Sequence, residues 1–167
     1  FGRFKNKKYI KNYNASTFYT WSDTQYRDFM MEMLMKLEPR YEPAGTILVD
    51  ELDEMTEIIF VYEGDINVGY EINKQKKYCF KFKDKCVIGS YGINFDQRAC
   101  FIYQASTKMH GYSIRKSNWH KLMEENTEIQ FYMRRNALIQ YMTEIRSKVM
   151  VHKKRAVDDF KKRNDHQ

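Results

Sequence analysis

A change of hydrophobic period along the chain limits the fold more than any other feature of the sequence. Apolar residues follow a helical spacing up to residue 37, alternate with polar residues between 41 and 114, and return to a helical spacing after 117. Alternation in short runs separated by turn residues is typical of antiparallel strands. The sequence therefore predicts an α+β fold, in which a jelly-roll-like antiparallel β-roll of seven to eight strands is flanked by an N-terminal helix and two C-terminal helices.

The N-terminal helix is expected to begin just after Trp21. Ser22 or Asp23 can cap it, and Pro39 ends it. The apolar residues that share one face of this helix are Tyr26, Phe29, Met30, Met33, Leu34 and Leu37. Such a methionine-rich face either packs into the core or serves as a docking surface.

The expected strands are short runs bounded by glycine, proline or polar residues. They cover residues 47–49, 58–62, 66–72, 78–82, 87–90, 99–104 and 110–114. Acidic residues occupy 50–54, and the polar segment 73–76 has the composition of a hairpin turn. This arrangement predicts a sandwich or barrel of antiparallel strands.

Two helices are expected after the strands. Ser117 can cap a short helix, and residues 127–130 have the form of a capping box at the start of a longer one. A single stripe of the longer helix is predicted to hold Leu138, Met142, Ile145, Val149 and His152. The domain is expected to span residues 23–152, with residues 1–22 as a linker or the end of a helical linker and residues 153–167 as a basic tail.

The composition excludes several classes of protein. A length of 167 residues, 43% hydrophobic, fits one folded domain, and the start at Phe1 suggests a fragment of a longer protein. No apolar run is long enough to span a membrane. The three cysteines have no zinc-ligand spacing, and no nucleophile–base or carboxylate pair emerges, so we expect neither a metal site nor an enzyme.

Basic residues gather at both ends of a chain whose net charge is +7. Such ends can bind nucleic acid or an anionic membrane surface, or they can be solvated segments that flank the domain. The chain ends without a helix-turn-helix motif, so we expect no nucleic acid partner.

The segment from Lys83 to Ala105 is the expected ligand site. Val87 and Ile88 run into Gly89 and Ser90, and a small residue at the end of a strand exposes backbone N–H groups that can hold a phosphate. Gly89 can equally be a simple turn glycine.

Four segments of the chain resemble the cyclic nucleotide-binding domain family, between about Thr24 and Lys154. They are Tyr41-x-Pro43-x-Gly45-x-Ile47, Phe60 to Val68 with Glu63-Gly64, Val87-Ile88-Gly89, and Ile114-x-Lys116-x-x-Trp119-x-x-Leu122. The last helix is similar to that of the cytoplasmic domain of voltage-gated channels, of the hyperpolarisation-activated and ether-à-go-go types, at Arg135-Asn136, Tyr141 and Val149 to Lys153.

The resemblance implies a pocket for cAMP or cGMP. Ligand-binding members have a Gly-Glu pair followed by an Arg-Thr or Arg-Ala pair, and here Ser90 stands at the Glu position after Gly89. Counting back from Ala105 without a gap puts Ala99 at the Arg position, whereas a one-residue loop deletion puts Arg98 there. The candidate residues implied for the ligand are Gly89, Ser90, Tyr91, Arg98, Ala99 and Cys100, with Tyr141, Ile145 or Arg146 as a cap over the base.

The departures from the family pattern leave nucleotide binding open, because losing the Glu and Arg contacts would cost about 3–5 kcal/mol, a loss of more than a hundredfold in affinity. If the pocket is empty, Arg98 is expected to pair with Asp96 or another nearby carboxylate. The resemblance implies a cytoplasmic regulatory domain of a membrane channel, which acts with the rest of that channel and is tetrameric in the full protein. The alternatives are a ligand-free interaction or assembly module, and a regulatory domain of a kinase regulator or a cation–proton exchanger.

Overall fold

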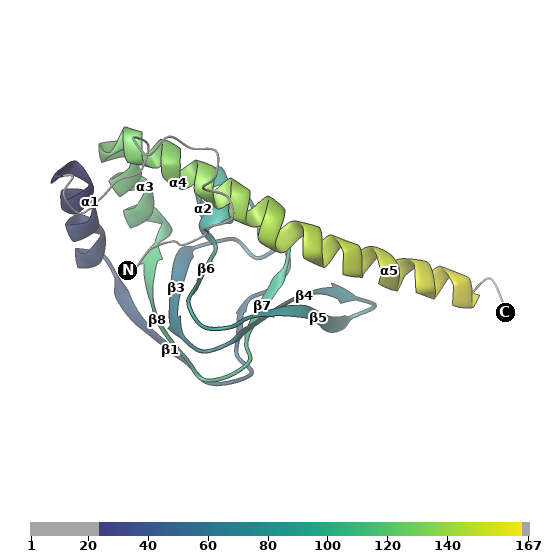
Figure 1. The fold of residues 1–167 in the computed structure, drawn as a ribbon. Coiled ribbons are helices and arrows are strands. Elements are labelled where there is room, and N and C mark those ends of the chain that lie inside the picture. The colour runs from purple at the N-terminus through teal and green to yellow at the C-terminus, as the bar shows by residue number, and fades with distance from the viewer. Residues whose placement is uncertain (1–23, 165–167) are drawn as a thin grey trace.

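A computed structural model describes residues 24–164 of the chain, as two packed β-sheets with helices at one side (Figure 1). The elements are α1 (Thr24–Met35), β1 (Glu38–Glu42), β2 (Ile47–Val49), β3 (Glu57–Glu63), β4 (Ile66–Ile72), β5 (Gln75–Phe82), β6 (Cys86–Ile88), α2 (Ser90–Phe95), β7 (Ile102–Ala105), β8 (Met109–Arg115), α3 (Lys116–Glu125), α4 (Thr127–Gln140), the π-helical segment η3 (Tyr141–Arg146) and α5 (Ser147–Asn164). The linker expected at residues 1–22 and the helix cap expected at Ser22 or Asp23 lie outside the described residues.

Each sheet has four antiparallel strands. One has the order β1-β8-β3-β6 and the other β2-β7-β4-β5, so that strands distant in sequence are neighbours. In the first sheet Phe60 faces Tyr112, and in the second Val68 faces Tyr103. The eight strands form the antiparallel roll that the sequence predicted, with α1 before it and α3 to α5 after it, so the predicted fold class is confirmed.

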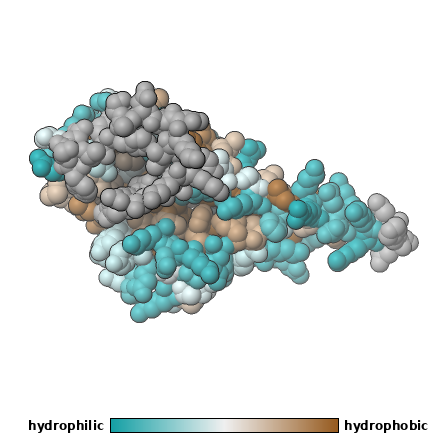
Figure 2. All heavy atoms as spheres, in the orientation of Figure 1, coloured by the Kyte–Doolittle hydropathy of each residue, from teal (hydrophilic) through white to brown (hydrophobic). Residues whose placement is uncertain are grey.

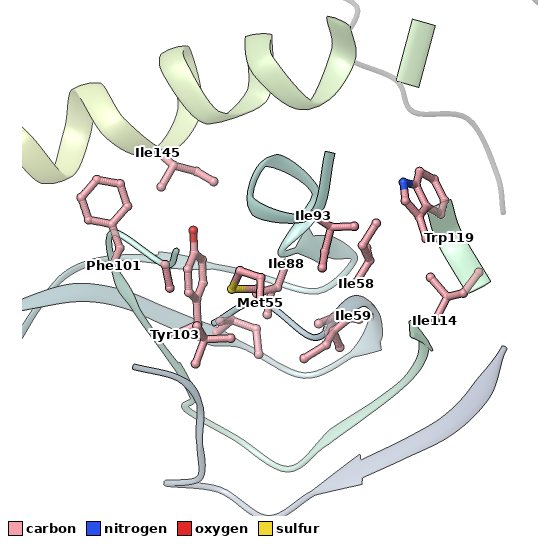
Figure 3. Close-up of a cluster of buried hydrophobic side chains, with 14 of the residues drawn as sticks. Met55, Ile58, Ile59, Ile88, Ile93, Phe101, Tyr103, Ile114, Trp119 and Ile145 are labelled. Atoms are coloured by element: carbon pink, nitrogen blue, oxygen red, sulfur yellow. The ribbon is translucent and has the colours of Figure 1, made fainter. Parts of the chain in front are cut away.

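The hydrophobic core lies between the sheets and continues under the helices. Ile59 and Ile88, which face each other in neighbouring strands, are 1% exposed. Figure 3 shows how Ile93 of α2 and Trp119 of α3 extend the cluster toward the helices. The domain thus uses one continuous core, and the helices are part of it.

Two elements differ from the expectation. Residues 38–42, for which no strand was predicted, form the edge strand β1, where Pro39 faces Tyr112. An edge strand tolerates a proline because the missing N–H can lie on the unpaired side. The polar segment after Gly89 is the helix α2, which the alternating apolar pattern did not indicate.

The caps expected for the C-terminal helices are not formed. α3 starts at Lys116, with Arg115 at the capping position, so Ser117 lies inside the helix. Asn126 precedes α4, and no side chain caps it. The Asn126 amide donates to the carbonyl of Leu122 instead (2.9 Å).

The last three helical segments follow one another without a break and cross the second sheet (Figure 1). Ile129, Ala137, Ile145 and Val149 are buried, at multiples of four residues. An α-helix drifts by about 40° every four residues, so it cannot keep such a stripe facing one way. The wider π-turn of η3 takes up part of this drift.

The π-turn also decides which residues of the predicted stripe face the core. Ile145 and Val149 are buried as expected, but Leu138 and Met142 are 40% and 43% exposed, and His152 is exposed. The prediction was wrong for these three, because it assumed an uninterrupted α-helix. Residues 153–164, expected as a basic tail, continue α5 as a helix.

Within residues 24–164, no helix is long and apolar enough to cross a bilayer. No cluster of three or more His, Cys, Asp or Glu side chains in this part of the chain could hold a metal ion.

Candidate functional site

A small, partly open pocket lies between the turn from β6 to α2, the segment leading into β7, and the helices that cross above. The side chains and backbone that line it come from Met55, Val87, Gly89, Ser90, Tyr91, Gly92, Arg98, Ala99, Cys100, Phe101, Tyr103, Ala137, Gln140, Tyr141 and Ile145. All six residues named from the sequence, from Gly89 to Cys100, are among them.

Gly89 fixes the shape of the turn at one wall of this pocket. It has φ 87°, in the left-handed region, and stands at the capping position of α2. A Cβ there would lie 2.7 Å from the carbonyl oxygen of Glu57 and 2.6 Å from Cε of Met55. Only glycine therefore fits both the conformation and the space. The helix that follows leaves its first N–H groups without partners inside the helix, which is favourable for an anion.

Ser90 is held from behind by a chain of hydrogen bonds to α3. The Asn94 amide donates to the Ser90 carbonyl (2.8 Å) and reaches its hydroxyl (3.3 Å). The side-chain oxygen Oδ1 of Asn94 accepts from Nε1 of Trp119 (3.0 Å). A serine hydroxyl accepts a weaker hydrogen bond from a ligand hydroxyl than does a glutamate carboxylate, which ligand-binding members of the family that this chain resembles have at this position.

Arg98 stands at the mouth of the pocket with its side chain exposed. Its Nη1 donates to the carbonyl of Leu52 (2.9 Å). The expected pairing with Asp96 is not formed, because the Asp96 carboxylate pairs with Nζ of Lys116 (2.6 Å), and this hydrogen bond lowers the pKa of Asp96. Arg98 is therefore held by a backbone carbonyl, which a phosphate could replace as a stronger, charged acceptor.

Ala99 is buried and tied to the acidic loop through its backbone. Its N–H donates to Asp53 O (2.9 Å), and its carbonyl accepts from Leu52 N–H (2.7 Å). These two hydrogen bonds set the direction of successive side chains, so that Ala99 points inward and Arg98 points outward. The structure thus puts both alternatives at the pocket, Arg98 at its mouth and Ala99 in its wall.

Aromatic rings from two separate parts of the chain fill the space between these walls. The rings of Tyr91 in α2 and Tyr141 in η3 are stacked, with 3.8 Å between their centroids and 4° between their planes. Phe101 lies 6.0 Å from Tyr141 on one side, and Phe95 lies 5.1 Å from Tyr91 on the other. The guanidinium of Arg134 lies over Phe95, 4.9 Å from its centroid.

Two tyrosine hydroxyls lie in apolar surroundings at this site. Burial raises the pKa of Tyr141, and a hydrogen bond with the Cys100 thiol raises it further. Burial also raises the pKa of Tyr103, whose hydroxyl points toward the helix that carries Ile145 (Figure 3). Both phenols are neutral at physiological pH and can act as hydrogen-bond donors.

Little free space remains in the pocket. The volume of the pocket is ≈ 30 Å³. A small-molecule site usually has roughly 300–1,000 Å³, so this volume admits water but no nucleotide. Tyr141 and Ile145 close the pocket, whereas the third expected cap, Arg146, is exposed and lies 3.8 Å from the sulfur of Met142.

Several residues that line the pocket were not predicted from the sequence. Phe101 and Tyr103 follow Ala99 at intervals of two, so the alternation along this segment could have placed them on the same face. Met55 reaches the pocket from the acidic loop, and no periodic signal marks it.

The sequence matches no protein-family model and no curated protein. Solved structures match the fold. The regulatory domain of Toxoplasma gondii PKA with cAMP matches with a TM-score of 0.54 at 10% identity, over 57% of this chain and 36% of that chain. cAMP-bound PfPKA-R matches with a TM-score of 0.53 at 14% identity, over 57% of this chain and 34% of that chain.

A third match is the c-di-GMP responsive global regulator CLP of Xanthomonas campestris, with a TM-score of 0.55 at 14% identity, over 70% of this chain and 59% of that chain. This chain has the fold of a cyclic nucleotide-binding domain. It spans between about a third and three-fifths of the length of these matched chains. In this cyclic nucleotide-binding fold, the pocket built from Gly89 to Phe101 is the candidate ligand site.

Proposed function

We propose that this chain is a regulatory domain of the cyclic nucleotide-binding fold, in which a cyclic nucleotide and Tyr141 compete for one pocket. The observation that carries the proposal is the stacking of Tyr141 on Tyr91, which fills the site with a side chain from the C-terminal helices. The domain therefore has a closed state, with Tyr141 inside, and an open state, with the pocket free.

In the open state, the ligand phosphate would lie at the turn of Gly89 and Ser90, where backbone N–H groups can donate to it. Arg98 would leave the carbonyl of Leu52 for the phosphate. Tyr91 would then offer its ring to the purine in place of the ring of Tyr141. The exchanges at Arg98 and Tyr91 replace contacts that the closed state already has, so their net gain is small.

The output of the domain would be the position of the C-terminal helices. Tyr141 belongs to η3, which is continuous with α4 and α5, so its departure from the pocket must shift both neighbours. A ligand that binds only the open state moves the population toward it by mass action. The same shift would move whatever part of the protein is joined to α5.

We propose cAMP or cGMP as the ligand, with weak affinity. Serine at the glutamate position loses a charge-assisted hydrogen bond worth about 1.5–3 kcal/mol. Displacement of the stacked tyrosine costs a further ~0.5–1.5 kcal/mol. A total of about 2–4.5 kcal/mol corresponds to a loss of roughly 30- to 2,000-fold in affinity.

A second candidate function rests on the same stacking. If Tyr141 never leaves the pocket, the domain is a ligand-free interaction or assembly module, whose α4–η3–α5 unit is locked to the roll. The pocket volume of ≈ 30 Å³ favours this candidate in the closed state.

For the larger protein, we propose the cytoplasmic domain of a voltage-gated cation channel, with a regulatory rather than a catalytic role and a tetrameric assembly. Support comes from the resemblance of the last helix, at Arg135-Asn136 and Val149 to Lys153, to the corresponding helix of such channels. A regulatory domain of a kinase or of a cation–proton exchanger would use the same pocket.

Calorimetric titration of the domain with cAMP and cGMP tests this proposal, with Arg98→Ala as the site variant and Arg27→Ala as a control with the same loss of charge at an exposed position of α1. We expect weak binding that Arg98→Ala abolishes and Arg27→Ala leaves unchanged. Binding that both variants retain would overturn the role of Arg98. The absence of heat up to millimolar nucleotide would favour the ligand-free module.

A further inference from the structure

The far end of α5 and the β4–β5 hairpin form a positively charged end of the molecule. Figure 1 shows α5 running past the sheets on the side where this hairpin ends. α5 has seven basic residues and two acidic ones, and residues 74–85, which include β5, have six lysines and one aspartate. At the opposite side, α1, β1 and β3 together have six acidic residues and two basic ones.

The two basic elements are joined by direct contacts, so their charges share one end of the domain. Nζ of Lys148 lies 5.2 Å from the ring centroid of Phe80 in β5, and Nζ of Lys153 lies 5.7 Å from that of Tyr70 in β4. The Tyr70 hydroxyl donates to the carbonyl of His152 (3.4 Å). α5 is therefore fixed to the hairpin through its first half.

The part of α5 from Lys154 onward has five cations and two carboxylates, Asp158 and Asp159. Among residues 24–163, no carboxylate lies within ion-pair distance of Lys154, Arg155, Lys161, Lys162 or Arg163. Their side chains are exposed. Figure 2 shows mainly hydrophilic residues over this projecting part of the molecule.

One large apolar side chain stands among these charges. Phe160 is 48% exposed and lies one helical turn after Ala156, which packs against the core. It is eleven residues after Val149, so it lies on about the same face of the helix, beyond the sheets that cover Val149. Asp158 and Asp159 directly precede Phe160, and Lys161, Lys162 and Arg163 follow it. A helix with an exposed aromatic residue and an excess of cations fits the interface of an anionic bilayer, where the ring enters the headgroup region and the cations meet the lipid charges.

We propose that the end of the domain formed by α5 and the β4–β5 hairpin binds an anionic lipid surface, with Phe160 inserted between the headgroups. The charge asymmetry sets the orientation, because an anionic surface attracts this end and repels the acidic side of α1, β1 and β3. The proposal does not depend on nucleotide binding, since none of its residues lines the pocket.

Sedimentation of the purified chain with phosphatidylcholine vesicles, with and without phosphatidylserine, tests this proposal. We expect binding only to the vesicles that contain phosphatidylserine, weakening as salt is raised. Lys161→Glu with Lys162→Glu should weaken it by roughly thirtyfold or more, since each basic residue near such a surface contributes about a factor of five. The matched control is Arg27→Glu with Lys121→Glu, which changes the net charge equally at exposed positions of α1 and α3.

Phe160→Ser separates insertion from charge. It should weaken binding severalfold with all basic residues retained, and unchanged circular dichroism would show that α5 still forms. No binding to anionic vesicles, an equal loss in the Arg27 and Lys121 control, or tighter binding to single-stranded RNA than to vesicles would each overturn the proposal.

Discussion

Replacement of Tyr141 by alanine should open the pocket. The substitution removes the ring that stacks on Tyr91 at 3.8 Å, a contact worth about 0.5–1.5 kcal/mol beyond its buried area. It also removes the contact with Phe101, with ring centroids 6.0 Å apart. Complete truncation of a buried aromatic side chain costs about 3–5 kcal/mol, and Tyr141 is only half-buried, so we expect a loss of about 2 kcal/mol in the free energy of unfolding.

The same change should strengthen nucleotide binding, because it destabilises only the closed state. If about 1–2 kcal/mol of the lost stability had favoured closure, the affinity for cAMP or cGMP should rise by roughly 5- to 30-fold. Most mutations in a binding site weaken binding, so a gain would be specific to competition. Calorimetric titration measures the affinity, and urea denaturation measures the stability.

A double-mutant cycle with Tyr91→Ala isolates the stacked pair. The coupling between the two substitutions in the free energy of unfolding should be about 0.5–1.5 kcal/mol. Met142→Ala is the matched control, since Met142 is next in sequence and 43% exposed. A coupling no larger than that between Tyr91 and Met142, or an unchanged nucleotide affinity in Tyr141→Ala, would refute the competition.

Three further predictions concern the surroundings of the pocket. Gly89→Ala should reduce stability by about 1–3 kcal/mol and raise the urea sensitivity of the whole domain, because φ is 87° and the carbonyl of Glu57 leaves no room for a Cβ; a neutral result would mean that this turn is not rigid. Burial raises the pKa of the Cys86 thiol from 9.0 to about 12, so the folded state keeps a proton that the unfolded state loses. Stability should therefore fall as the pH rises from about 9 toward about 12, and Cys86→Ala should remove this part of the fall in urea midpoints; an identical alkaline profile in the variant would contradict the assignment. Glu51→Gln should speed amide hydrogen exchange along α5, because Glu51 accepts from Nζ of Lys153 (3.4 Å), whereas Glu124→Gln, at an exposed position of α3, should not.

The strands could be predicted from the sequence because one face of each is buried, which imposes alternation. Ile66, Val68 and Tyr70 are all 4% exposed or less, as a strand with one buried face requires. The edge strand β1 could not be found in this way. It is mostly exposed, so its residues carry little alternation, and its proline argued against a strand.

The short helix α2 was hidden for a different reason. Its sequence, SYGINF, has few strong helix formers and only six residues, so propensity favours a turn there. Its packing overrides this preference, since Gly92 and Ile93 are buried and the Asn94 side chain is bonded to Trp119. Contacts with α3 and the core, which are distant in sequence, form this helix.

The pocket could be located from the sequence, but its closed state could not. The Val87-Ile88-Gly89 turn and the segment from Arg98 to Cys100 carry a local pattern, and Val87, Gly89, Arg98, Ala99 and Cys100 line the pocket. The contact of Tyr141 with Tyr91 joins residues fifty positions apart and depends on the phase of a helix that contains a π-turn. No local pattern in the sequence reports that phase.

An NMR measurement of contact between the rings of Tyr91 and Tyr141 tests the central claim most directly. With labelled tyrosine rings, assigned through Tyr91→Phe and Tyr141→Phe, the free domain should give a nuclear Overhauser effect between the two rings, as their separation of 3.8 Å requires. We expect the signal to disappear as cAMP or cGMP saturates the site. A free domain without this signal, or a nucleotide-saturated domain that keeps it, would contradict the competition between Tyr141 and the ligand.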